Sequence, residues 1–195
     1  MIRKLSAILI FCLFSCASVN ERHLEEAVSN GEMLFQEKRY SEAMTVCSEA
    51  EQMARQLDDQ FCLGKIYRIM AHISNAAYRY QDEIQYLKMA SDAFHNAEKP
   101  YNRLYVDMEK GMAYYNVSDY ASAEKVYRDV LYRAYEVSDT ALQAQCLSAY
   151  AALSLEVSRP DPSLAIDMLS RVANDLKYPL SSADRGVLAY AYSLS

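Results

Sequence analysis

The sequence predicts an all-α protein built as a solenoid of stacked helix pairs. Tyrosines recur at equal intervals, at Tyr40, Tyr80 and Tyr120, and each follows a small residue by nine positions. That small position continues along the chain at the same interval, as Gly31, Ala71, Gly111, Ala151 and Ala191. A fixed period of this size is typical of an array of stacked supersecondary units, and such arrays display binding surfaces far more often than they perform chemistry.

Two helices in every period account for the spacing of the apolar residues. After Tyr120 these residues form a single amphipathic stripe, namely Ala123, Val126, Tyr127, Val130, Leu131 and Ala134. We expect the first helix of each pair near 22–37, 61–78, 101–116, 141–157 and 183–195. The second helices are expected near 41–57, 82–97, 119–136 and 162–177. Glycine inside a helix costs about 1 kcal/mol relative to alanine, so the recurring Gly/Ala position predicts close helix approach.

Several helix ends carry their own signals. Thr140 with Gln143, and Ser181 with Asp184, have the form of a capping box. The Asp161-Pro162 pair has the form of an N-cap followed by proline at the first helical position.

The second helix of each pair also has a recurring small position, which Ala43 and Ala123 occupy. Because the turn before the last of these helices is about two residues longer, we expect Ala165 to take this position in the fourth repeat. Glu83 stands there in the second repeat. We expect it to lie in the first turn, where the helix dipole favours a carboxylate, with Ile84 rotating into the core.

The pattern of a small residue, a tyrosine nine positions later and an alanine three after that, as in Gly111, Tyr120 and Ala123, resembles the tetratricopeptide repeat. The resemblance covers residues 22–195, with a period of about 40 instead of the usual 34 or so. It implies a right-handed α-α superhelix of about four and a half helix pairs. It also implies a module that binds a protein or peptide in its concave groove, with no catalytic residues, no cofactor and no metal.

The start of the chain resembles a bacterial lipoprotein signal. Arg3 and Lys4 precede an uncharged apolar run that ends in Leu13-Phe14-Ser15-Cys16, too short to span a membrane. We expect residues 1–15 to be removed, Cys16 to be lipidated, residues 16–21 to form a tether and residues 22–195 to form the repeat domain. The alternative is an ordinary signal peptide with an incidental cysteine.

The charge balance argues against nucleic acid as a partner. Without Arg3 and Lys4 the chain has 18 of its 20 basic residues against 26 acidic ones, a balance that repels phosphate backbones. No later stretch offers 18 uncharged apolar residues, so we expect membrane attachment through the lipid on Cys16 alone. The tether Ala17-Ser18-Val19-Asn20 lacks an acidic cluster, and we therefore expect a protein of the bacterial cell envelope that faces the periplasm.

Residues that could perform chemistry are scattered. Cys47, Cys62 and Cys146 are expected to be small buried core residues without a disulfide, because helix geometry keeps the nearest pair apart. The histidines, at positions 23, 72 and 95, share no spacing typical of metal ligands. Because there is also no phosphate-binding glycine loop and no nucleophile elbow, we expect a protein that is not an enzyme.

The concave face of the array is the predicted binding surface. The positions that point away from the second helix of each pair are Lys65, Arg68, His72 and Asn75 in the second repeat, and Tyr105, Met108, Met112 and Tyr115 in the third. A basic and polar strip beside an aromatic and methionine strip suits an extended or helical peptide. The alternative for Tyr105, Met108 and Met112 is packing against the next helix.

Two further alternatives concern the whole protein. The final helix is strongly apolar, whereas repeat arrays normally end with a polar cap. Either it packs back as a crude cap, or the chain is part of something longer, similar to the periplasmic sensor portion of Bacteroidetes regulators. A different function, capture of glycans by an outer-membrane lipoprotein of an uptake system, is less favoured, because the turns are short and tryptophan is absent.

Overall fold

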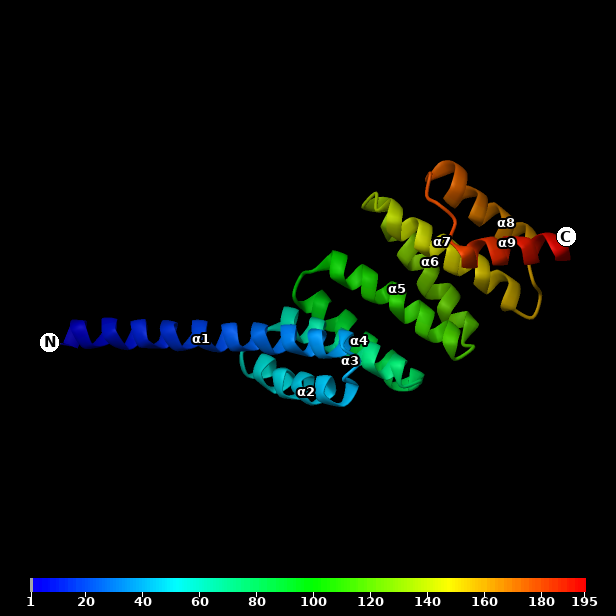
Figure 1. The fold of residues 1–195 in the computed structure, drawn as a ribbon. Coiled ribbons are helices and arrows are strands. Elements are labelled where there is room, and N and C mark those ends of the chain that lie inside the picture. The colour runs from blue at the N-terminus through cyan, green and yellow to red at the C-terminus, as the bar shows by residue number, and fades with distance from the viewer. Residues whose placement is uncertain (1) are drawn as a thin grey trace. The chain divides into compact units, whose positions relative to one another are not determined.

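A computed structural model describes the backbone of residues 2–195 and the side chains from Val19 onward. The predicted signal of residues 1–15 and the side chain of Cys16 lie outside the described side chains. Residues 2–195 form helices joined by turns and irregular connections, and they contain no strand (Figure 1). The helices are α1 (Ile2–Gln36), α2 (Tyr40–Gln56), α3 (Gln60–Ala76), α4 (Tyr80–Asn96), α5 (Pro100–Asn116), α6 (Tyr120–Glu136), α7 (Thr140–Glu156), α8 (Pro162–Ser170), the π-helical turn η1 (Arg171–Asp175) and α9 (Ser182–Leu194). The predicted all-α class is confirmed.

The helices from α2 to α7 share one length and one spacing. Each contains 17 residues, and they begin at equal intervals, at positions 40, 60, 80, 100, 120 and 140. One period of the sequence is therefore two helices and two three-residue turns. This helical-repeat architecture was predicted, and the expected boundaries differ from the observed ones by no more than two residues in these helices.

The turns between these helices are all built in the same way. Each contains a residue with a left-handed backbone and a φ between 53° and 61°, namely Lys38, Asp58, Tyr78, Glu98, Ser118 and Ser138. The amide of the following residue donates to a carbonyl five residues earlier, as from Arg39 to Leu34 at 2.9 Å and from Asp139 to Ala134 at 3.0 Å. The left-handed residue and this hydrogen bond together form a Schellman motif, which satisfies carbonyls in the last turn of the helix.

Aspartates begin several of the helices. The side chains of Asp59, Asp119, Asp139 and Asp161 each accept a hydrogen bond from the amide three residues later. The predicted Asp161 cap and the Ser181–Asp184 capping box are confirmed. The predicted Thr140–Gln143 box is wrong, because Asp139 caps α7 and Gln143 instead donates from Nε2 to the Ala134 carbonyl at 3.0 Å.

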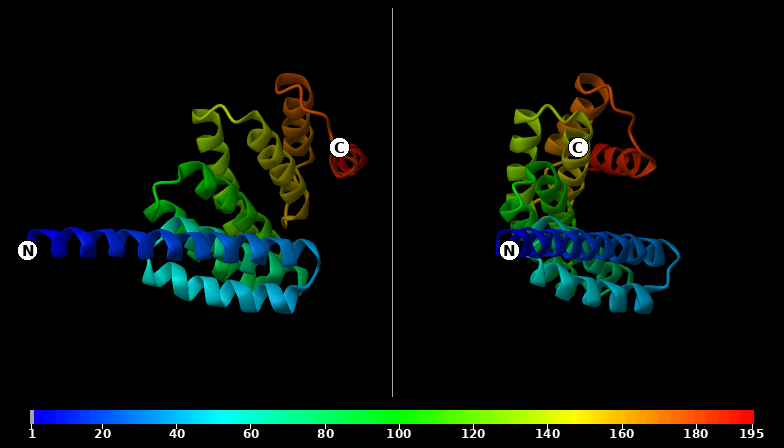
Figure 2. Two further views of the ribbon diagram at one scale, coloured as in Figure 1. Left: turned by 60° about the vertical axis from the view of Figure 1, so that its left-hand side comes forward. Right: turned by 90° about the vertical axis from the view of Figure 1, so that its left-hand side faces the viewer.

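The chain forms two compact units, Met1–Pro100 and Tyr101–Ser195. In unit 1 helices α1 and α2 lie side by side, as Figures 1 and 2 show, and α3 packs on α4. Small residues make this packing close. A Cβ added to Gly31 would lie 2.9 Å from Cys47 Sγ, and one added to Gly64 would lie 2.6 Å from the Phe94 ring.

Unit 2 packs α5 to α9 around Tyr127, Leu142, Leu147, Leu153 and Leu169, all fully buried. A Cβ on Gly111 would lie only 2.5 Å from the Tyr127 ring. The repeating small positions of the sequence, at 31, 71, 111, 151 and 191, are all buried. The prediction that they mark close helix approach is confirmed, and Ala165 is fully buried as expected.

The end of unit 2 departs from the repeat. The predicted helix over 162–177 ends early, because α8 runs into η1, where the Leu176 amide donates to the Arg171 carbonyl at 3.0 Å. Tyr178 precedes Pro179 and is disfavoured in the helical region, so the chain leaves the helix at Lys177, with φ at 55°. Helix α9 then crosses α8 instead of continuing the antiparallel order (Figure 2).

Candidate functional site

A groove with a volume of about 340 Å³ opens on unit 2 and is the candidate site. One wall comes from α5 and a second from α7, and the third comes from η1, the irregular chain after it and the first turn of α9. The lining residues are Met108, Met112, Ala144, Gln145, Ser148, Ala149, Val172, Tyr178, Pro179, Ser181 and Asp184. The lining is mostly apolar, with a few polar side chains, as is usual for sites that bind small molecules or peptide segments.

The α5 wall consists of two methionines one helical turn apart. Met108 is 4% exposed and belongs to the core of the unit, whereas Met112 is 51% exposed. The groove therefore has a fixed apolar base at Met108 and a mobile, polarizable rim at Met112, because methionine has three rotatable bonds. Gln145 and Ser148 provide polar groups on α7, one turn apart.

The third wall is shaped by the π-helical turn. Val172 within η1 lines the groove, and its carbonyl accepts from the Tyr178 amide at 3.0 Å. This bond folds Tyr178 and Pro179 back along the groove. The capping box then fixes the wall, since the Ser181 amide donates to Asp184 Oδ2 at 2.8 Å and the Asp184 amide donates to Ser181 Oγ at 3.1 Å.

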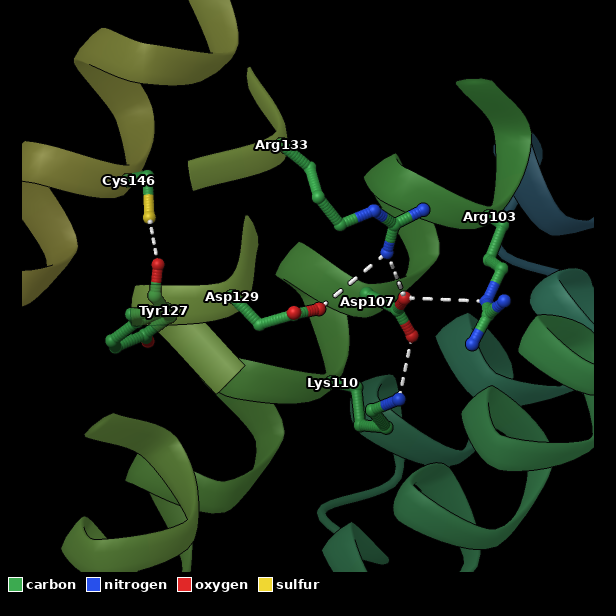
Figure 3. A network of polar contacts seen from close by, with 7 residues as sticks. All are labelled: Arg103, Asp107, Lys110, Tyr127, Asp129, Arg133 and Cys146. Atoms are coloured by element: carbon green, nitrogen blue, oxygen red, sulfur yellow. Dashed lines mark hydrogen bonds and ion pairs between the residues drawn. The ribbon is translucent and has the colours of Figure 1, made fainter. Parts of the chain in front are cut away.

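A buried carboxylate holds α5 in position next to the groove (Figure 3). The side chain of Asp107 is 7% exposed and precedes Met108 in the chain. Lys110 Nζ lies 2.6 Å from one of its oxygens, and Arg133 Nη1 on α6 lies 3.1 Å from the other. Arg103 adds a third cation at 3.7 Å. A buried charge is stable only when it is paired in this way, so the cluster ties α5 to α6.

The residues predicted from the second repeat lie on α3 in unit 1. Lys65 Nζ stands 4.7 Å from the centre of the Phe61 ring, and His72 packs on Phe35 with ring centres 5.7 Å apart. Arg68 is half-buried on the same helix.

Asn75, the fourth predicted residue of α3, is engaged by Glu83. Asn75 Nδ2 donates to both carboxylate oxygens of Glu83, at 3.0 and 2.9 Å. Glu83 is buried, and Ile84 fills the core beside it as expected. The amide of Asn75 therefore serves to pair a buried carboxylate at the start of α4.

The residues predicted from the third repeat divide into two groups in unit 2. Met108 and Met112 meet at the groove, whereas Tyr105 and Tyr115 are not among its lining residues. The Tyr105 hydroxyl donates to Asp139 Oδ2 at 2.8 Å, and this bond raises the pKa of Tyr105. The Tyr115 ring packs on Tyr120 with centres 5.7 Å apart, and burial raises the pKa of Tyr115.

Most of the lining residues were not anticipated from the sequence, in particular Gln145, Ser148, Tyr178, Pro179 and Asp184. The available signal was the loss of the regular helix spacing after α7. The connections 157–161 and 176–181 are longer than the three-residue turns before them. In repeat proteins, insertions of this kind mark loops on one face, often the binding face.

The three cysteines with described side chains do not line the groove. Cys47, Cys62 and Cys146 are free and buried, as predicted. Burial raises the pKa of Cys47 and of Cys62 to about 11 and that of Cys146 to about 12, and the Cys146 thiol donates to the Tyr127 carbonyl at 3.0 Å (Figure 3). Such thiols are inert packing groups.

The part of the chain whose side chains are described contains neither a cluster of metal-ligating residues nor a helix able to span a membrane. Its side chains include no group of three or more His, Cys, Asp or Glu residues arranged to hold a metal ion. Within the same range, no helix combines the length and apolar character needed to cross a membrane. No protein-family model matches the chain, and no curated protein is similar to it.

Proposed function

We propose that this protein is a non-catalytic module that binds a protein or peptide, with a tetratricopeptide-like right-handed superhelix as its scaffold. The observation that carries the proposal is the apolar groove of unit 2, lined by Met108 and Met112 on one side and by Tyr178 and Pro179 on the other. The bound segment supplies apolar side chains to this groove. In this role the module acts as a scaffold or as the sensor part of a signalling or regulatory protein.

The chemistry of the walls supports a peptide as ligand. Methionine side chains adapt to partners of different shape and are common on surfaces that bind peptides. Gln145 and Ser148 offer an amide and a hydroxyl that can pair with the main chain of a peptide. The volume of about 340 Å³ lies at the lower end of the range for ligand sites, which suits a short stretch of side chains.

The site of action in this proposal is the bacterial cell envelope. Cleavage after Ser15 and lipidation of Cys16 would attach the module to a membrane, facing the periplasm, so that its partner is another envelope protein. Cells that express the Cys16→Ala variant should retain an uncleaved or mis-sorted precursor that incorporates no labelled fatty acid. Normal processing of this variant would point to an ordinary signal peptide.

The decisive experiment compares two methionines of matched exposure. Met112 at the groove is 51% exposed, and Met33 on α1 in unit 1 is 50% exposed. Short random peptides displayed on phage are selected on the full chain in mild detergent, and the best binders are measured against both variants. Met112→Asp should weaken binding at least about tenfold, since a charge replaces an apolar anchor, whereas Met33→Asp should leave it unchanged.

Two further arms separate the alternatives. Arg68→Ala tests the predicted strip on α3, and unchanged peptide binding is expected for this variant because the strip is not part of the groove of unit 2. A glycan array tests the uptake hypothesis. Binding of a glycan that Met112→Asp leaves intact, together with the absence of any selected peptide, would overturn the proposed function.

A further inference from the structure

The groove of unit 2 has an uneven distribution of charge. Asp184 is the one ionisable carboxylate or cation among its lining residues; the others are apolar, amide or hydroxyl side chains and a tyrosine. Lys177 and Arg185 are close in sequence but do not line the groove. The guanidinium of Arg185 is directed to the main chain, where Nη1 donates to the Leu180 carbonyl at 3.0 Å.

The carboxylate of Asp184 is held in place by a hydrogen bond, and some of its acceptor positions remain unoccupied. One oxygen, Oδ2, accepts the Ser181 amide at 2.8 Å and so fixes the rotamer of the side chain. Among the described residues no hydrogen bond or ion pair reaches the other oxygen, Oδ1. A carboxylate has about four acceptor positions, so a fixed and half-exposed acceptor remains at the wall of an apolar groove.

The neighbouring aromatic ring adds to the preference for a cation. Tyr178 lines the same wall, three residues before the capping box begins at Ser181. Tyrosine rings attract ammonium and guanidinium groups through the negative face of the ring. The opposite wall, with Met108 and Met112, provides no charge and accepts an aliphatic side chain.

We infer that the groove selects a peptide segment in which a basic residue stands beside an apolar anchor, with Asp184 as the group that recognises the cation. This inference rests on the proposed function, because it specifies the ligand of the same groove. The apolar anchor packs against Met108 and Met112, and the lysine or arginine of the segment pairs with Asp184 Oδ1. A segment with an acidic residue in that place is rejected.

The test starts from the peptides selected on the full chain. The selected pool should be enriched in Lys and Arg within two positions of Leu, Ile, Met or Phe. A synthetic peptide from the pool is then compared with copies in which the basic residue is replaced by glutamine or by glutamate. The glutamine copy should bind about fivefold more weakly, as expected for a partly exposed ion pair, and the glutamate copy more weakly still.

The matched variants are Asp184→Asn and Asp161→Asn. Asparagine at 184 keeps an acceptor for the Ser181 amide and removes only the charge. Asp161 caps α8 and does not line the groove, so Asp161→Asn makes the same change in net charge elsewhere. Asp184→Asn should reduce the affinity for the basic peptide about fivefold and leave the affinity for the glutamine copy unchanged. Asp161→Asn should bind both peptides with the affinity of the parent protein.

The outcomes distinguish a failure of the proposed function from a failure of the cation preference alone. If no peptide is selected, or if Met112→Asp binds the selected peptides normally, the proposed function fails. If peptides bind in a manner that depends on Met112 but show no basic enrichment, or if Asp184→Asn and Asp161→Asn weaken binding equally, the groove stands and the cation preference is overturned. A loss confined to Asp184→Asn, which fades as salt rises, supports the inference.

Discussion

The connections between the helices fall into two kinds. From α1 to α7 they are three-residue turns with one geometry, in which the same left-handed position recurs at equal intervals from Lys38 to Ser138. After α7 the two connections are longer, the helix between them ends in a π-helical turn, and the last helix crosses its neighbour. The groove is lined by residues of the second connection and not by any residue of the regular turns.

The difference separates scaffold from site. A turn repeated without change places each helix on the previous one through the same small buried positions. After α7 the chain departs from this turn, and Tyr178 and Pro179 in the longer connection form a wall of the groove. Repetition provides the packed scaffold, and its interruption forms the groove that we propose as the binding surface.

The largest effect is expected where the regular packing is tightest. Gly111→Leu should reduce the free energy of unfolding by about 3 kcal/mol, since even a Cβ at this position would lie 2.5 Å from the Tyr127 ring. Gly186→Leu in α9 is the matched control, because nothing lies within 4 Å of a Cβ there. Urea denaturation followed by circular dichroism measures both. Equal stability of the two variants would show that the small positions do not carry the packing.

A smaller loss is expected from the ion cluster that supports the groove. Asp107→Asn should destabilise by about 2 kcal/mol, because Lys110 and Arg133 would lose a carboxylate whose side chain is only 7% exposed. Asp129→Asn is the control; its carboxylate also approaches Arg133, at 3.6 Å, but is 65% exposed. Thermal unfolding of both variants tests this. A loss for Asp129→Asn that matches that for Asp107→Asn would contradict the role of burial.

The smallest effect concerns the turns themselves. Glu98→Gly should stabilise by about 0.5 to 1 kcal/mol, since its φ of 54° is strained for a residue with a Cβ. Lys177→Gly, with φ at 55° in the irregular connection, should have the same sign. Ala97→Gly, one position earlier with φ at −79°, should instead destabilise by a similar amount. The midpoints of urea denaturation of the three variants are compared. Destabilisation by Glu98→Gly would show that the left-handed backbone at this position is not strained.

The sequence was sufficient for the regular part of the fold because the same constraints recur there. The period, the small positions and the apolar stripes each indicate the same helices, so errors at one repeat are corrected by the others. Local capping was less certain. Thr140 and Asp139 both belong to residue types that cap helices well. Which of them caps α7 depends on the left-handed backbone at position 138, and the residue there is serine instead of the glycine that would have indicated it.

The groove was only partly predictable, for a physical reason. Met108 and Met112 follow from helix periodicity on α5. The π-helical turn and the path of Tyr178 depend instead on competition between a proline, a buried Val172 and the packing of α9, which local sequence does not reveal. Tyr105 and Asn75 were predicted to face a ligand, and sequence alone did not reveal their partners within the protein, Asp139 in the turn before α7 and Glu83 on α4.

Site-specific photo-crosslinking tests the central claim, that the interrupted part of the repeat forms the binding surface. A photoreactive phenylalanine analogue replaces Tyr178 at the groove or, in a separate protein, Tyr132 on α6, which is 65% exposed and is not a lining residue. With a selected peptide bound, the protein modified at position 178 should form a covalent adduct with the peptide and the protein modified at 132 should not. An adduct at 132 of equal yield, or none at 178 while the peptide still binds, would contradict the claim.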